Sequence, residues 1–437
     1  MVDVVNRMIG AYRKEYERRP VPTLFLTILI AFFIIFVTAA LITGGDTLYN
    51  VLNSDKSRFF GDYFESIVDS YYDPYTYGNV IYPPLIVTLY AVQAHFIIPF
   101  VRIPSGGTLT PELIRSSQMG IMVFMIITLV TFYALYVIYS RLVKDADIRK
   151  ELTFFFTILL AYPFVYAVER GNSIILALVF CFIFIMGYRS ENRFVRYASY
   201  IALGIAAGIK IYPLILWLLI VRNREYREAA VCAVIIAALL FIPFVFTDGG
   251  PLTFIDNFLI HSESRLGFTN ITQITTGLLH EICGLPDNGV TILSYIILGL
   301  FTLLSFIIIL FDKEMKFWKV LALVGCNLVL GLGSGVQYQT IYLMPAMLYF
   351  LIAEKKMTKE NLFYVVCFAM MMVLIPGIEI SGAISTSAGD VGFYPSAVIG
   401  AMESAFVIIM AVALLREGLM RIYRSRSAER REHAAEV

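Results

Sequence analysis

The feature that most constrains this chain is a succession of long apolar runs along nearly its whole length. A helix of about 20 residues crosses the roughly 30 Å hydrocarbon layer of a bilayer. Backbone in lipid must form helices or closed barrels, and unbroken apolar runs lack the alternation of barrel strands. The sequence therefore predicts an all-α, polytopic membrane helix bundle of about 10–12 transmembrane segments. Twelve candidate segments can be marked: 21–42, 82–101, 116–140, 152–168, 172–188, 198–221, 229–247, 290–311, 317–333, 338–353, 361–379 and 395–415.

Charged residues make up only 15% of the 437 positions, well below the quarter typical of soluble domains. No stretch is left over for a separate soluble domain, so residues 1–437 are predicted to form a single integral membrane domain. The net charge of +1 hides a segregation, because bases gather at the termini and in short loops. This pattern predicts membrane lipid as the surrounding and no nucleic acid as a partner.

Cysteine usage and motif content exclude several classes of protein. Five cysteines are too few and too scattered for a disulfide framework or a metal cluster. The sequence has no phosphate-binding glycine loop, no His–Glu metal spacing and no hydrolase elbow, so it predicts no metal site and no other cofactor, with a divalent metal requirement left open. Four cysteines lie inside apolar runs and are expected to pack in the core: Cys181, Cys232, Cys326 and Cys367.

Two polar interruptions organise the chain. Residues 43–80 form a first outer loop, in which interfacial helices are expected, and residues 248–289 form a second. Between these loops, 82–225 contains the broken and charged segments of the core. Residues 290–420 are predicted to form the C-terminal helices, and 421–437 a basic cytoplasmic tail.

Loop charges predict the topology, because lysine and arginine in short loops mark the cytoplasmic side. Both termini come out cytoplasmic under this rule. If every segment crossed, however, the basic loops 141–150 and 189–196 would lie outside. Both loops return to the cytoplasmic side if 82–101 and 198–221 enter the membrane and come back without a net crossing. Both of these segments are interrupted by proline, as expected of backbone that lines a watery cavity. The alternative of twelve crossings stays open.

The first outer loop holds candidates for a catalytic acid. In "GDYFESI", Asp62 is surrounded by aromatic residues, which predicts a short amphipathic helix lying on the bilayer with its aromatic face down. A carboxylate partly shielded from water there would be suited to accept a proton. Asp55 and Asp46 are secondary candidates, and a solvated surface role is the alternative for each.

Two positively charged residues lie within or beside apolar runs, where a charge is energetically costly. Lys210 lies deep in "GIAAGIKIYPLIL", where a charge costs at least about 2.5–3.5 kcal/mol. Arg170 precedes a Gly-Asn turn in "ERGN", and guanidinium suits the oxygens of a phosphate. The alternatives are a lysine whose ammonium extends to the interface and an arginine that pairs with Glu169 at a helix end.

Other polar and aromatic residues are candidates for substrate contact. Tyr75 and Tyr82, in "YTYGNVIYPPL", are either interfacial-belt residues or rings on which a sugar stacks. His261, Arg265 and Asn270 of the second outer loop either contact a polar ligand or belong to an ordinary solvated loop.

The order of these features resembles that of a known superfamily. One span is followed by an acidic loop with "GDYFESI", then by "YPPL", "RGN" and "GIKIYP". This order is similar to that of the C-type glycosyltransferases (GT-C), and most similar to glycosyltransferase family 87, the polyprenyl-phosphate-mannose-dependent mannosyltransferases. The resemblance covers roughly residues 40–225.

The resemblance implies a membrane glycosyltransferase. It would move mannose, or another hexose or pentose, from a polyprenyl-phosphate donor to a lipid-linked or glycan acceptor on the non-cytoplasmic face, in the plasma membrane if the host is prokaryotic. The family's catalytic aspartate is carried onto Asp62, with Asp55 and Asp46 as alternatives because some relatives place it nearer the first span. The matching motifs add Asn172 and Tyr212 as substrate contacts, and the expected chemistry is inversion with Asp62 as base.

Two other classes of protein share parts of this pattern. A transporter or lipid flippase also places charges and broken helices around a polar cavity, although no repeated halves are visible here. An oligosaccharide polymerase or ligase is likewise multispanning with outer loops.

Overall fold

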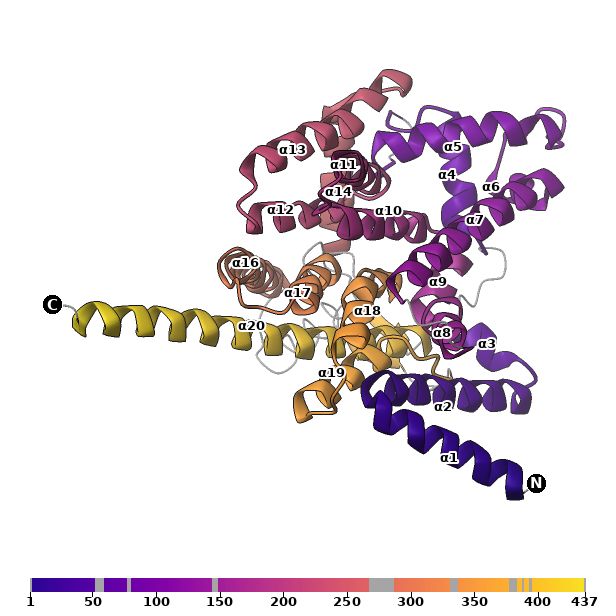
Figure 1. Cartoon of the computed structure of the whole chain (residues 1–437). Coiled ribbons are helices and arrows are strands. Elements are labelled where there is room, and N and C mark those ends of the chain that lie inside the picture. The colour runs from indigo at the N-terminus through magenta and orange to yellow at the C-terminus, as the bar shows by residue number, and fades with distance from the viewer. Residues whose placement is uncertain are drawn as a thin grey trace.

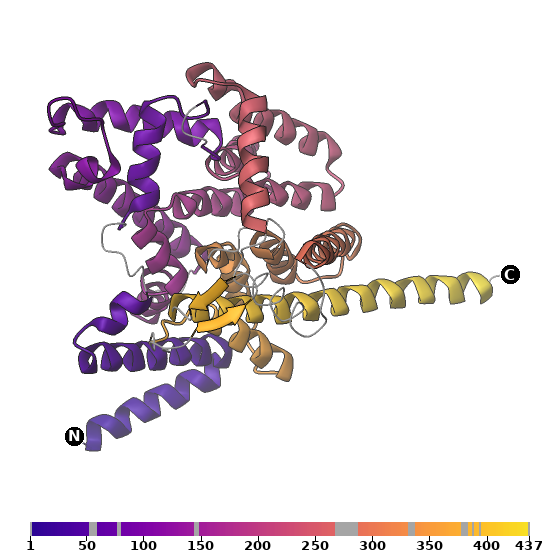
Figure 2. The same cartoon turned by 180° about the vertical axis from the view of Figure 1, so that it is seen from behind.

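The computed structural model describes residues 2–51, 59–76, 80–143, 148–266, 287–330, 337–376, 383–386, 389–392 and 395–435. Within these ranges the chain is an all-α bundle with one short hairpin, as expected from the apolar runs (Figures 1 and 2). The N- and C-terminal ends lie toward opposite sides of Figure 1, and α20 extends beyond the other helices.

The helices carry both long apolar stretches and short breaks. Their bounds are α1 (Val2–Arg18), α2 (Pro20–Ile42), α3 (Asp46–Val51), α4 (Gly61–Tyr71), α5 (Pro84–Ile97), η2 (Ile98–Phe100), α6 (Pro111–Ser116), α7 (Gln118–Leu142), α8 (Ile148–Phe154), η3 (Phe155–Leu159), α9 (Tyr162–Arg170), α10 (Ile174–Gly187), α11 (Arg193–Ile209), η4 (Tyr212–Trp217), α12 (Leu218–Arg222), α13 (Tyr226–Phe241), η5 (Ile242–Phe246), α14 (Pro251–Leu266), α16 (Asp287–Phe311), α17 (Phe317–Leu330), η6 (Gln337–Leu343), α18 (Met344–Ala353), α19 (Lys359–Met370) and α20 (Pro395–Ala435). The hairpin pairs β1 (Ala383–Thr386) with β2 (Gly389–Gly392) in antiparallel register.

Several described helices have the length and apolarity of membrane spans. Pro20–Ile42, Gln118–Leu142 and Tyr226–Phe246 each qualify alone. Lys150–Leu159 and Tyr162–Arg170, bent by 50°, qualify as one broken span. Seven further apolar helices are shorter. One apolar run is divided by an irregular residue, since α11 ends before the extended Lys210 and the chain continues in η4.

The segment 198–221 turns back on itself. Helix α11 ends at Ile209, Lys210 is extended, and η4 and α12 return the chain. The loops at the two ends meet, since the guanidinium of Arg189 donates a hydrogen bond to the side chain of Asn223. The residues that precede α11 and those that follow α12 are therefore close to each other.

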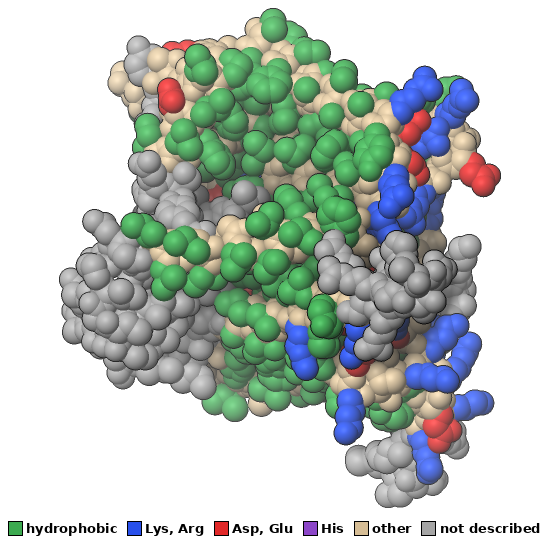
Figure 3. All heavy atoms as spheres, turned by 90° about the vertical axis from the view of Figure 1, so that its left-hand side faces the viewer, with side chains coloured by type: hydrophobic (Ala, Val, Ile, Leu, Met, Phe, Trp, Pro, Cys, Tyr) green, Lys and Arg blue, Asp and Glu red, His purple; other side chains and the backbone are tan. Residues whose placement is uncertain are grey.

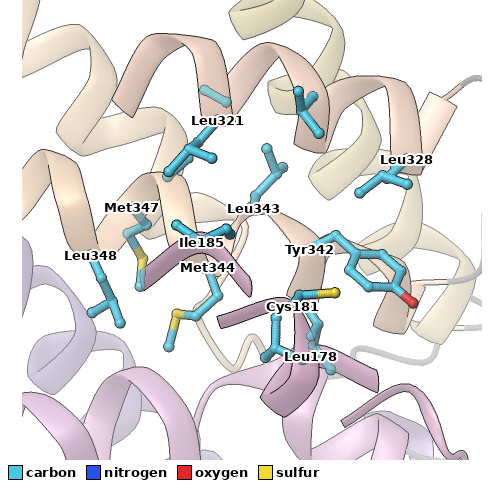
Figure 4. Close-up of a cluster of buried hydrophobic side chains, with 14 of the residues drawn as sticks. Leu178, Cys181, Ile185, Leu321, Leu328, Tyr342, Leu343, Met344, Met347 and Leu348 are labelled. Atoms are coloured by element: carbon cyan, nitrogen blue, oxygen red, sulfur yellow. The ribbon is translucent and has the colours of Figure 1, made fainter. Parts of the chain in front are cut away.

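The main core joins helices from both halves of the chain. Figure 4 shows side chains of α10, among them Leu178 and Cys181, packed against α17, η6 and α18. All four cysteines predicted to pack in the core are buried there, with exposed fractions of 0–1%. Apolar side chains also cover most of the described surface in Figure 3, where lysines and arginines gather along one edge. Exposed residues such as Ile42 and Val245, both about four-fifths exposed, fit a lipid-facing surface.

A buried ion-pair network fastens α20 to the bundle. The Lys319 ammonium on α17, 2% exposed, lies 2.6 Å from a Glu417 carboxylate oxygen on α20 and also pairs with Glu360 on α19. One turn further along α20, Arg421 bonds Asp312 at 2.9 Å. The carboxylates of Glu360 and Glu417 compensate the charge of Lys319, whose burial without a partner would be energetically costly.

We expect Lys319→Met to destabilise the protein by about 2 kcal/mol, because it removes the buried ammonium that binds Glu417 and Glu360 together and leaves Arg421 as the cation beside Glu417. Chemical unfolding of the detergent-solubilised protein measures this loss. The control is Arg13→Met, since the side chains of Arg13 and its partner Glu17 are 82% and 68% exposed and their pair should contribute less than about 1 kcal/mol. Equal destabilisation by both variants would contradict the assigned role.

Candidate functional site

The "RGN" motif forms a helix-ending turn. Helix α9 ends at Arg170, and Gly171 takes a left-handed conformation with φ of 69°. The Gly171 and Asn172 amides donate hydrogen bonds to the carbonyls of Val168 and Ala167, the paired bonds of a Schellman motif. The turn predicted from the Gly-Asn pair is confirmed. It directs the side chains of Arg170 and Asn172 to the same place.

That place is occupied by Asp62, the first acidic residue of α4. Its Oδ1 accepts a hydrogen bond from Arg170 Nη2 at 2.5 Å, and its Oδ2 accepts one from Asn172 Nδ2 at 2.7 Å. Asn172 Nδ2 also lies 3.1 Å from the Tyr338 hydroxyl oxygen. The structure thus brings together three residues that the sequence singled out, with Asp62 more than 100 positions away from the other two.

The backbone holds the two segments in this register. The Phe60 amide donates to the Glu169 carbonyl at 2.7 Å, and Phe60 itself takes a left-handed conformation, rare for a bulky residue. A Cβ on Gly171 would lie 2.9–3.1 Å from atoms of Tyr63 and Phe60. Glycine is therefore required at position 171 for both its conformation and its lack of a side chain.

Packing of α4 differs from the expectation. Its aromatic face was expected to lie on the bilayer, but Tyr63 and Phe64 are buried against other helices. The Phe124 ring of α7 lies 5.1 Å from the Tyr63 ring, and the Tyr63 hydroxyl donates to Gln93 on α5 at 2.6 Å. The apolar face of an amphipathic helix can pack on lipid or on other helices. The sequence pattern alone does not distinguish these two surroundings. The helix that carries Asp62 is consequently packed against α5 and α7.

Charge and burial around α4 favour a site partly closed to water. The side chain of Asp62 is 11% exposed and that of Arg170 is 29% exposed. Further along the same helix, burial and the neighbouring Glu65 carboxylate raise the pKa of Asp69 to about 6. The carboxylates of Asp62 and Asp69 are therefore both partly shielded from water, and Arg170 supplies the charge that compensates Asp62.

A pocket opens beside the site. Its volume is about 80 Å³, and α5, α7, α9 and α10 supply most of its lining. Apolar side chains such as Ile86, Leu89 and Ile175 form most of the wall, and Gln93, Asn172 and Ser173 are among its polar residues. The pocket is therefore mainly apolar, with a few polar groups.

Lys210 lies at the predicted helix break. It is 9% exposed, and its ammonium nitrogen lies 4.2 Å from the centre of the Tyr82 ring. The preceding residue, Ile209, belongs to the same buried cluster as Tyr63 and Phe64, which follow Asp62. Lys210 is thereby placed at the edge of the packing that supports Asp62.

The structure does not support Tyr75 as a ring on which a sugar stacks. It is 1% exposed, with its ring packed between Phe244 and Phe254. Burial and the nearby Asp248 carboxylate raise its pKa, so the hydroxyl stays protonated and donates to the Tyr82 carbonyl at 2.8 Å. No face of the ring is free for a ligand.

The remaining candidates have separate outcomes. Asp46 is exposed at the start of α3, and Tyr212 is half-buried at the start of η4. Asp55 and Asn270 lie outside the described residues, and so do the side chains of His261 and Arg265. Among the residues that are described, no three His, Cys, Asp or Glu side chains gather as a metal site would require.

Two contributors were not singled out from the sequence. Tyr338 contacts Asn172 from the beginning of η6, and Asp248 binds the first loop from the start of the second. The signal for Tyr338 was the polar stretch "QYQT", which interrupts an otherwise apolar region. Asp248 stood beside two glycines in a loop, where an acidic residue is ordinarily solvated.

The fold and the site define a helical membrane protein with a carboxylate–guanidinium–amide cluster beside an apolar pocket. The family model of glycosyltransferase family 87 matches residues 80–333. The chain therefore belongs to glycosyltransferase family 87 and is a membrane glycosyltransferase. The match includes Arg170, Asn172 and Lys210, whereas Asp62 precedes it. Searches of curated proteins and of solved structures found no match.

We expect Gly171→Ala to lower sugar transfer by at least about tenfold, because the added methyl group collides with backbone and Cβ atoms of the segment that carries Asp62. Transfer rates of purified protein measure the effect. Gly10→Ala is the control, since a Cβ there meets no atom within 4 Å. Full activity of the Gly171 variant would show that this close approach is not needed.

Proposed function

We propose that the protein transfers a sugar from a polyprenyl-phosphate donor to a lipid-linked or glycan acceptor, with inversion at the sugar carbon. Mannose is the first donor sugar to test, as the family resemblance implies. The observation that carries the proposal is the Asp62 carboxylate held by Arg170 and Asn172. This arrangement combines a proton acceptor and a phosphate-binding cation within one hydrogen bond of each other.

Asp62 is the proposed general base. A carboxylate has about four lone-pair positions, so the two hydrogen bonds it accepts leave room for an acceptor hydroxyl. Asp62 removes the hydroxyl proton as the oxygen attacks the sugar carbon from the side opposite the phosphate. The new carbon–oxygen bond forms, the bond to the phosphate oxygen breaks, and the proton stays on Asp62.

Arg170 and Lys210 are the proposed partners of the phosphate. A glycoside hydrolase needs a second carboxylic acid to protonate its leaving group. A lipid phosphate leaves as an anion, so cations suffice to stabilise the charge that develops. The guanidinium of Arg170 has five N–H donors and can bind Asp62 and a phosphate oxygen together.

The pocket beside Asn172 supports a lipid-linked donor. Its wall is mostly apolar, which suits part of a hydrocarbon chain, and Asn172, which lines it, also bonds Asp62. We further propose a multi-pass protein with its site on the non-cytoplasmic face and both termini in the cytoplasm. The basic loops and the return of segment 198–221 favour this orientation.

We expect Asp62→Asn to reduce transfer from radiolabelled polyprenyl-phosphate mannose by at least about 100-fold, because the amide cannot accept the proton. The measurement uses purified proteins at matched concentration and a panel of lipid acceptors. Asp73→Asn, at an exposed position of the same loop, should keep wild-type rates. Survival of transfer in the Asp62 variant would move the base elsewhere, and no transfer by the wild type from any polyprenyl-phosphate sugar would refute the donor class.

Arg170→Lys should raise the KM for the donor by about tenfold and lower kcat as well. An ammonium is a single point charge and cannot hold Asp62 and phosphate through a planar fork. Steady-state kinetics with varied donor concentration report both constants. Arg102→Lys, at an exposed position, is the charge-conserving control. An unchanged KM would argue against phosphate binding by Arg170.

A further inference from the structure

Residues at the start of the second outer loop form hydrogen bonds with the backbone of the first outer loop. Asp248 accepts hydrogen bonds from two successive backbone amides, with Oδ1 3.2 Å from the Tyr75 nitrogen and Oδ2 2.9 Å from the Thr76 nitrogen. Asn257 on α14 donates to the Tyr75 carbonyl at 2.9 Å. Gly249, with φ of 65°, allows this approach, since a Cβ there would lie 3.1 Å from Tyr75 Cβ. Both backbone groups of Tyr75 are therefore fixed from residues more than 170 positions away.

Further contacts connect Tyr75 to Lys210. Through its hydroxyl, buried Tyr75 fixes the carbonyl of Tyr82, seven residues later. Tyr82 precedes Pro83 and Pro84, whose rings restrict the backbone on its C-terminal side. The Tyr82 ring then lies against the Lys210 ammonium at 4.2 Å from its centre. A continuous set of contacts thus joins Asp248 to Lys210.

We infer that Asp248 and Asn257 are positioning residues that set the location of the Lys210 ammonium through Tyr75 and Tyr82. This inference rests on the proposed role of Lys210 in binding the donor phosphate. Cation–phosphate attraction falls with distance, and a cation fixed before binding loses no freedom when the phosphate arrives. The second loop consequently acts on donor affinity without touching the donor.

The first experiment compares Asp248→Asn with Asp256→Asn, an exposed acid next to Asn257 on α14. The amide introduced at position 248 would place N–H groups against a backbone N–H, so one of the two bonds is lost. We expect the donor KM to rise about tenfold with kcat changed less than twofold, and no change in the control. Tyr75→Phe, which keeps the ring and removes one hydroxyl, should raise KM about threefold. A fall in kcat with KM unchanged would overturn the inference.

A double-mutant cycle separates positioning from general support of the fold. If Asp248 acts through Lys210, the Asp248→Asn change should not raise KM further in a Lys210→Met background. A full tenfold rise in that background would overturn the inference, because it would show an effect that does not pass through Lys210.

Hydrogen exchange by mass spectrometry tests the contacts without any sugar donor. In Asp248→Asn, backbone amides of residues 80–87 and 208–214 should exchange faster, while those of 167–173 keep their wild-type rates. Unchanged exchange at 208–214 would overturn the inference. If instead the wild type transferred no sugar but these exchange changes occurred, the proposed function would fail while the mechanical link between the loops would stand.

Discussion

The whole site depends on the junction between the segment that carries Asp62 and the end of α9. A loop that leaves one span could place Asp62 in many positions, and the "RGN" turn allows only one. Gly171 lets the Phe60 segment approach within van der Waals contact, and Arg170 and Asn172 then bond the two carboxylate oxygens of Asp62. Backbone conformation, side-chain packing and ion pairing each hold Asp62 in the same position. A preorganised site requires such fixed groups.

Much of this could be predicted from the sequence. The lengths of the apolar runs give the helical membrane fold, and the isolated charges Arg170 and Lys210 mark the interior sites, because a charge among apolar residues needs a compensating function. Asp62 stood out from its neighbouring acids by its aromatic surroundings. Family membership then decides between a transferase and the transporter class, which the charge pattern alone did not separate.

Other features could not be predicted because they depend on contacts between distant segments. The aromatic face of α4 packs on α5 and α7, although the same pattern fits a helix on lipid. Tyr75 has the composition of an interfacial tyrosine, and only Phe244, Phe254 and Asp248 convert it into a buried support. The breaks before α9 and after α11 also shorten runs that hydropathy alone presents as whole spans.

The proposed mechanism moves charge between groups that are already in contact. Before the donor binds, Asp62 cancels the charge of Arg170. A sugar–phosphate–lipid diester carries one negative charge, and Lys210 is the second cation proposed to bind it. Transfer then protonates Asp62 and leaves a phosphate monoester, which approaches two negative charges at neutral pH. One negative charge therefore moves from the carboxylate to the phosphate, and the total charge does not change. Arg170, which contacts Asp62 before reaction, is the cation best placed to follow that charge.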